Sequence, residues 1–101
     1  MPIQRKIRAY VDIPTHIGPP VTQALTIANI SLTGCFLRTD VWLDIGTALT
    51  IYIPLKSPSV LELRGRVVRH HEEPNGYGIS FEGIVEDVEK ELAILIAKTV
   101  E

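Results

Sequence analysis

Alternation of apolar and polar residues runs through the middle of the chain. Between Thr47 and Ile53, leucine and isoleucine take every second position, and threonine and tyrosine lie between them. Successive side chains of a strand point to opposite faces, so this pattern predicts a half-buried strand that ends at Pro54. The segment 61–69 alternates in the same way, with leucine and valine on one face and glutamate and arginine on the other.

A hairpin is the clearest local prediction. The segment 72–76 reads Glu-Glu-Pro-Asn-Gly, which is typical of a turn. It is followed by Tyr77–Phe81, in which Tyr, Ile and Phe share one face and Gly78 and Ser80 lie opposite. The strands before and after the turn are therefore expected to pair as an antiparallel hairpin.

Shorter strands are expected nearer the start of the chain. Val11 and Ile13 indicate a strand that ends at Pro14, followed by a loop over 16–20. The segment 23–30 is rich in strand formers, but its apolar residues change parity before Ile30, which a bulge near Asn29 would explain.

The rest of the chain completes an all-β pattern with one helix. Residues 35–39 predict a further short strand, and residues 40–46 a loop that holds Trp42, as a core plug or as an exposed anchor for a partner. Six short strands at this spacing favour an antiparallel barrel or sandwich. The period then changes over 85–98, where apolar residues recur at helical spacing and predict an amphipathic helix packed on the barrel. Those apolar residues are Val85, Val88, Leu92, Leu95 and Ile96.

Length and charge refine this picture. A chain of 101 residues fits one domain over 1–101, with a flexible basic arm at 1–8, a barrel over 9–83 and the helix. The arm holds three basic residues and no acid, whereas the remainder holds seven basic and twelve acidic residues. A net charge of −2 argues against a DNA or RNA partner. A basic arm on an acidic body fits a local anion site, although a frayed, solvated terminus explains it too.

Other features point to a soluble cytoplasmic domain. Cys35 is the only cysteine, so no disulfide forms within the chain, and a thiol inside a strand is typical of a core residue. The chain shows neither a signal peptide nor a span long enough to insert into a membrane. We expect no metal site.

No enzyme signature is found. Ser31 and Cys35 are the possible nucleophiles, and His16, His70 and His71 are the possible bases. Adjacent histidines on a strand point to opposite faces, which prevents the pair from chelating a metal. A small hydrolase remains a minor alternative, and we expect a non-enzyme.

Two small polar residues, Asn29 and Ser31, precede a glycine at position 34. Asn29 and Ser31 would share one face of an extended segment, and they offer amide and hydroxyl groups for a guanine edge or a phosphate oxygen. Gly34 would permit a turn with positive φ and the close approach of a ligand. The alternative is that the segment satisfies its own backbone.

Basic residues of the arm could complete such a site. Arg5 and Arg8 carry guanidinium groups, which bind phosphate or guanine through two parallel hydrogen bonds and also stack on base planes. An arm that folds over the strand ends could close the site on an anionic ligand.

These motifs together resemble the PilZ domain, whose ligand is cyclic di-GMP. The chain matches the family's [D/N]-x-S-x-x-G motif at Asn29, Ser31 and Gly34, and the segments 65–69 and 76–81 are similar to its late hairpin. The resemblance covers essentially the whole chain. It implies a six-stranded antiparallel PilZ-type β-barrel with a C-terminal α-helix, and no cofactor besides the ligand.

One family motif is altered. PilZ domains carry R-x-x-x-R before the first strand, but here Gln4 occupies the first arginine position, and Arg5 and Arg8 form R-x-x-R. Arg5, one position later, is the candidate to replace the missing guanidinium. The resemblance also places Arg69 near the ligand, where its guanidinium could stack on a guanine; a surface ion pair is the alternative.

The resemblance implies a bacterial cyclic di-GMP receptor that regulates motility or exopolysaccharide production. Ligand binding would order the arm and create a surface for an unidentified downstream protein, with the chain a monomer or weak dimer. Some relatives lack the arginine motif and act through protein contacts alone. The alternative function is therefore a PilZ-like interaction module that does not bind nucleotide.

Overall fold

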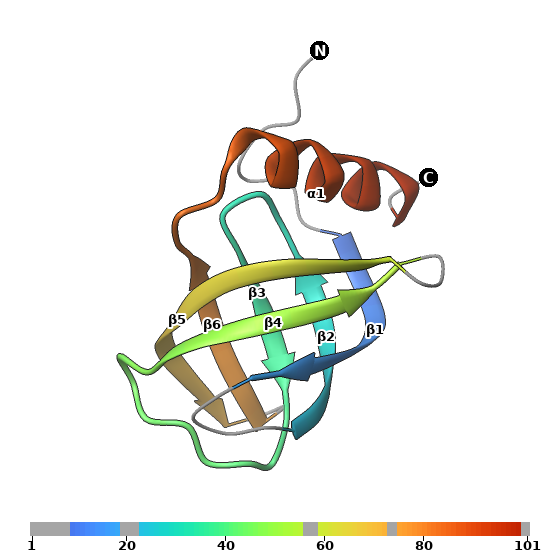
Figure 1. Cartoon of the computed structure of the whole chain (residues 1–101). Helices are drawn as coiled ribbons and strands as arrows, with labels where there is room; N and C mark the ends of the chain where they lie inside the picture. Colours follow the sequence, from blue (N-terminus) through green and yellow to red (C-terminus); the bar gives the residue numbers. More distant parts are fainter. Residues whose placement is uncertain (1–8, 19–22, 56–58, 73–74, 100–101) are drawn as a thin grey trace.

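The alternating segments close into a barrel, shown in Figure 1. In the computed structural model, which describes residues 9–18, 23–55, 59–72 and 75–99, the strand order is β1-β2-β3-β6-β5-β4, and β4 pairs with β1 to close the sheet. All six neighbouring pairs are antiparallel. The predicted six-stranded antiparallel barrel with a C-terminal helix is confirmed. The elements are β1 (Ala9–Ile17), β2 (Gln23–Ile30), β3 (Gly34–Arg38), β4 (Ala48–Pro54), β5 (Val60–Glu72), β6 (Asn75–Phe81) and α1 (Glu86–Thr99).

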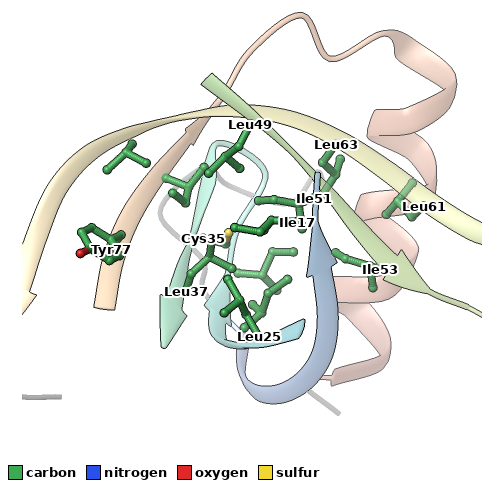
Figure 2. Close-up of a cluster of buried hydrophobic side chains, with 14 of the residues drawn as sticks. Ile17, Leu25, Cys35, Leu37, Leu49, Ile51, Ile53, Leu61, Leu63 and Tyr77 are labelled. Carbon is green, nitrogen blue, oxygen red and sulfur yellow. The ribbon is translucent and has the colours of Figure 1, made fainter. Parts of the chain in front are cut away.

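The apolar face of each strand fills the barrel. Figure 2 shows side chains from several strands meeting inside it, among them Ile17, Leu37 and Ile51. In β5, buried and exposed positions alternate from Val60 to Val67 as the sequence pattern predicts, and the residues after Val67 are exposed. The thiol of Cys35 belongs to the same core, as expected of a cysteine within a strand.

Helix α1 covers one end of the barrel (Figure 1). Its side chains Leu92 and Ile96 are fully buried and join the barrel core. Burial of each such side chain contributes roughly 1.5–3 kcal/mol. A single helix of this length is marginal in water, so its packing on β1 and β5 stabilises it.

The first strand differs from its prediction. We expected it to end at Pro14, with a loop from His16, but β1 continues to Ile17. Pro14 pairs with Thr26 of β2, whereas pairing with β4 is recorded only at His16 and Ile17. A proline before the β4 pairing removes no hydrogen bond to that strand, so β1 tolerates it.

The predicted hairpin is present, and its strands are longer than expected. β5 continues past Arg69 to Glu72, which pairs with Asn75 at the start of β6. The predicted bulge near Asn29 is confirmed at Ala28, where the β2–β3 register shifts between Ile27 and Asn29.

Two further expectations concern the basic arm and the absence of a membrane-spanning segment. The basic arm, with Gln4, Arg5 and Arg8, lies outside the described residues. Within the described ranges, no helix has the length and apolar character needed to cross a bilayer.

Candidate functional site

The turn between β2 and β3 is closed by its own polar groups. The backbone N–H of Ser31 donates to the carbonyl oxygen of Gly34 at 2.8 Å. The Ser31 hydroxyl lies 3.3 Å from the same oxygen and accepts from the Thr33 N–H at 3.3 Å. Ser31 as a whole is 0% exposed. In this structure the hydroxyl supports the turn, and a direct contact with a ligand would require the turn to open.

Gly34 has a different role from the predicted one. Among the described residues, positive φ occurs at Gly46 (93°) and Gly83 (61°), so Gly34 does not make a positive-φ turn. It lies in β3 opposite Ser80, and a Cβ added to it would collide with the carbonyl oxygen of Ile79. Glycine is needed here because the β6 backbone passes too close for any side chain.

The strand register places two predicted site residues in one row on the outer face. Asn29 of β2 pairs with Phe36 of β3, and Phe36 pairs in turn with Gly78 of β6. Gly78 then pairs with Arg69 of β5. Paired residues share a face, and the neighbours of Phe36 along β3 point into the core, so the row faces outward. Three steps between strands separate Asn29 from Arg69, or about 14 Å.

A bulge brings Arg69 to this face. By parity, Arg69 belongs with the inward residues Leu63 and Val67, but the β5–β6 register shifts between Val67 and Arg69. The extra residue, Val68, turns the following side chain outward. Arg69 is exposed and lies across Gly78, since a Cβ on Gly78 would be 2.7 Å from the Arg69 Nε.

A concavity of about 250 Å³ lies beside this row. Both Gly34 and Arg69 line it, and among the described residues that do, Arg69 is the only charged one. An exposed arginine beside a concavity suits a flat anionic group, because the planar guanidinium can both pair with the anion and stack on a flat ring. The other lining residues are Thr33, Cys35, Val68, Gly78, Ile79 and Ser80.

A larger concavity, of about 420 Å³, lies over β4 and β5. It is lined by Arg64 and Glu82 and by small residues such as Gly65. None of Asn29, Ser31, Gly34 and Arg69, the predicted site residues that the structure describes, lines it, so its size alone does not make it the better candidate.

Phe36 is a feature that the sequence prediction missed. Its ring is on the outer face yet only 8% exposed, because it lies over Gly76, where a Cβ would be 2.6 Å from the ring. The ring meets His71 edge-on at 5.9 Å, whereas the His70 ring contacts Tyr77, so the two histidines point apart as predicted. Apolar residues at 35–37 mask the alternation that would have placed Phe36 outside.

The two possible nucleophiles lie in the interior of the fold. The Cys35 thiol and the Ser31 hydroxyl are both buried, the latter within its turn. In the ranges that the structure describes, no three His, Cys, Asp or Glu side chains are grouped to hold a metal ion.

Comparison with known families identifies the class of protein. The family model of the PilZ domain matches residues 3–98, so the chain belongs to the PilZ family. Members of this family typically bind cyclic di-GMP and act as receptor modules without catalytic activity. A search of curated proteins finds no match.

Two solved structures show the same fold. The Bacillus subtilis inhibitor of motility, MotI/DgrA, is 18% identical with a TM-score of 0.76, over 95% of this chain and 51% of its own. The chain thus spans about half the length of that inhibitor. The PilZ domain of CeSA, from a cellulose-synthesising bacterium, is 17% identical with a TM-score of 0.74, over 95% of this chain and 100% of its own. At this identity the likeness establishes the fold alone.

Proposed function

We propose that the chain is a cyclic di-GMP receptor that binds its ligand on the outer face of the barrel, between the β2–β3 turn and Arg69. The observation that carries the proposal is the register, because Asn29 and Arg69 occupy one row beside the concavity lined by Gly34. Membership of a family that typically binds cyclic di-GMP supports this choice of ligand.

The chemistry of the row suits the two parts of this nucleotide. Arg69 can stack on a guanine or pair with its O6 and N7 atoms, and the Asn29 amide can donate to and accept from a base edge. Gly78 leaves room for the Arg69 side chain to lie close to the strand, where it can present its guanidinium to the ligand. Ser31 would hold the turn in shape, and would contact the ligand only after its hydrogen bonds rearrange.

The arm supplies the remaining positive charge. Arg5 and Arg8 would clamp the phosphates and stack on the guanines, and Gln4 would add hydrogen bonds without charge. Clamping would order the arm and present a new surface to a downstream protein. The ligand can shift the equilibrium between the open and the ordered arm only by its difference in affinity for these two states.

Calorimetric titration with cyclic di-GMP tests the proposal. We expect saturable heat at micromolar protein, and no comparable heat with cyclic di-AMP, whose bases present a different hydrogen-bonding edge. Absence of heat with cyclic di-GMP would contradict the proposed function.

Replacing Arg69 with alanine is expected to weaken cyclic di-GMP binding about tenfold, because a hydrogen bond to a charged group contributes about 1.5–3 kcal/mol. Stability should change by less than about 0.5 kcal/mol, because the side chain is exposed. The matched control is Arg64→Ala, an exposed arginine on the same strand that lines the other concavity. Equal losses in the two variants, measured by calorimetry, would remove Arg69 from the site.

Replacing Gln4 with arginine restores the family's R-x-x-x-R spacing and adds a positive charge that can pair with phosphate. We expect cyclic di-GMP to bind about tenfold more tightly to this variant. Gln4→Lys is the control, since it adds the same charge without the planar guanidinium, and its gain should be smaller. An unchanged affinity for Gln4→Arg, measured by the same titration, would contradict the proposal that the arm contacts the ligand.

A second function is favoured by the β2–β3 turn itself. The Ser31 hydroxyl is fully used within the turn, and Gln4 cannot neutralise a phosphate. Both features suit a PilZ-like module that binds a partner protein without nucleotide. This alternative predicts that a partner, once identified, binds equally well with and without cyclic di-GMP.

A further inference from the structure

Trp42 is highly exposed, yet its indole is held in place. Trp42 lies in the loop between β3 and β4 and is 72% exposed. The indole Nε1–H donates to the Asp44 carboxylate at 2.8 Å, and the ring lies 6.0 Å from the ring of His70. An exposed aromatic side chain that is already ordered loses little conformational entropy when a partner covers it.

A network of hydrogen bonds fixes the loop on the β5–β6 hairpin. The Leu43 N–H donates to the Tyr77 hydroxyl at 3.0 Å, and the Asn75 amide donates to the Thr39 carbonyl at 2.7 Å. Asn75 also bonds the His70 ring at 2.8 Å, and that ring packs on Tyr77. The ring that supports Trp42 is therefore itself held from two sides.

The surroundings of Trp42 are acidic and partly apolar. Asp44 bonds the indole, and Asp40 lies 3.5 Å from the Asn75 amide. Glu72 pairs with Asn75 at the hairpin end, and Arg38 is the basic residue that precedes the loop. Ile45 adds an apolar side chain that is 60% exposed. Three carboxylates thus accompany two exposed apolar residues.

We propose that this surface, formed by Asp40, Trp42, Asp44, Ile45 and Glu72, docks an arginine-bearing segment of a partner protein. A guanidinium stacks on the face of the indole and pairs with the neighbouring carboxylates, since arginine combines cation–π contact with bidentate hydrogen bonding. Tryptophan is among the residues that dominate binding energy at interfaces. The loop is at the end of the barrel away from α1 (Figure 1), and Trp42 meets the ring of His70, which packs on Tyr77 and not on the outer row that holds Phe36 and Arg69.

Selection from a random peptide library displayed on phage, with the whole chain as bait, tests this assignment. We expect the enriched peptides to contain arginine, and their affinity to fall more than about tenfold for Trp42→Ala and for Asp44→Asn. Arginine-to-lysine changes in the peptides should weaken binding as well. Trp42 is the only tryptophan, so its fluorescence reports the same titration directly.

The controls separate docking from folding and from nucleotide binding. Ile94→Ala removes an exposed apolar side chain from α1, and it should leave peptide binding unchanged. Trp42→Ala should keep the melting temperature and the cyclic di-GMP titration of the parent chain. The proposal is overturned if no peptide is enriched, if the enriched peptides lack arginine or are insensitive to Trp42→Ala, or if sedimentation shows that a second copy of this chain covers the surface.

Discussion

Replacing Arg8 with alanine is expected to weaken cyclic di-GMP binding by about two orders of magnitude. The guanidinium would contact phosphate and guanine together, and two hydrogen bonds to charged groups contribute about 3 kcal/mol or more. That free energy corresponds to roughly a hundredfold change in the dissociation constant. Calorimetric titration of the variant measures the change, and a thermal melt confirms that the variant is folded.

Lys6→Ala is the matched control for this loss. Both substitutions remove one positive charge from the same eight-residue arm. If Arg8 clamps the ligand through its planar guanidinium, Lys6→Ala should weaken binding only a few-fold, through long-range electrostatics. Equal losses of affinity in the two variants would indicate that the arm contributes only general positive charge. Full affinity in Arg8→Ala would contradict the assignment of Arg8 as a clamp.

Replacing Gly34 with alanine is expected to destabilise the fold by about 2–4 kcal/mol. The new methyl group would overlap the carbonyl oxygen of Ile79, and a backbone atom inside a paired sheet cannot move away cheaply. For a domain of this size, the loss lowers the melting temperature by roughly 10–20 °C. Thermal and urea unfolding followed by circular dichroism measure it.

Gly83→Ala distinguishes a steric clash from a backbone conformation. Gly83 has φ of 61°, and apart from its chain neighbours no atom of the described residues lies within 4 Å of the position where its Cβ would be. Its replacement with alanine should therefore lower the free energy of unfolding by only about 1 kcal/mol, because a residue with a Cβ is disfavoured in the left-handed conformation. If Gly34→Ala were no less stable than Gly83→Ala, the close contact between β3 and β6 would not limit that position.

The strands with one buried face could be predicted from the sequence, because alternation is a local property. β4 and the first part of β5 show it directly, and the change of period marks α1. The end of β1 could not be predicted in this way. Whether a strand tolerates Pro14 depends on which neighbour it has at that position, and the neighbour comes from the closure of the barrel.

The candidate site was predicted only as a set of residue types. Asn29, Gly34 and Arg69 were selected from motifs, but their meeting on one face depends on bulges at Ala28 and Val68. Each bulge reverses the parity beyond it, so counting along the sequence places Arg69 on the wrong face. The role of Gly34 was missed for a related reason, since the backbone that excludes a side chain belongs to a distant strand.

Amide NMR shifts recorded during a cyclic di-GMP titration test the central claim most directly. We predict that the largest shifts occur at Asn29, Phe36, Gly78 and Arg69 and in the turn 31–34, while the amides of the loop 40–46 stay in place. Absence of shifts, or shifts concentrated in the loop 40–46 around Trp42, would contradict a nucleotide site on this outer face.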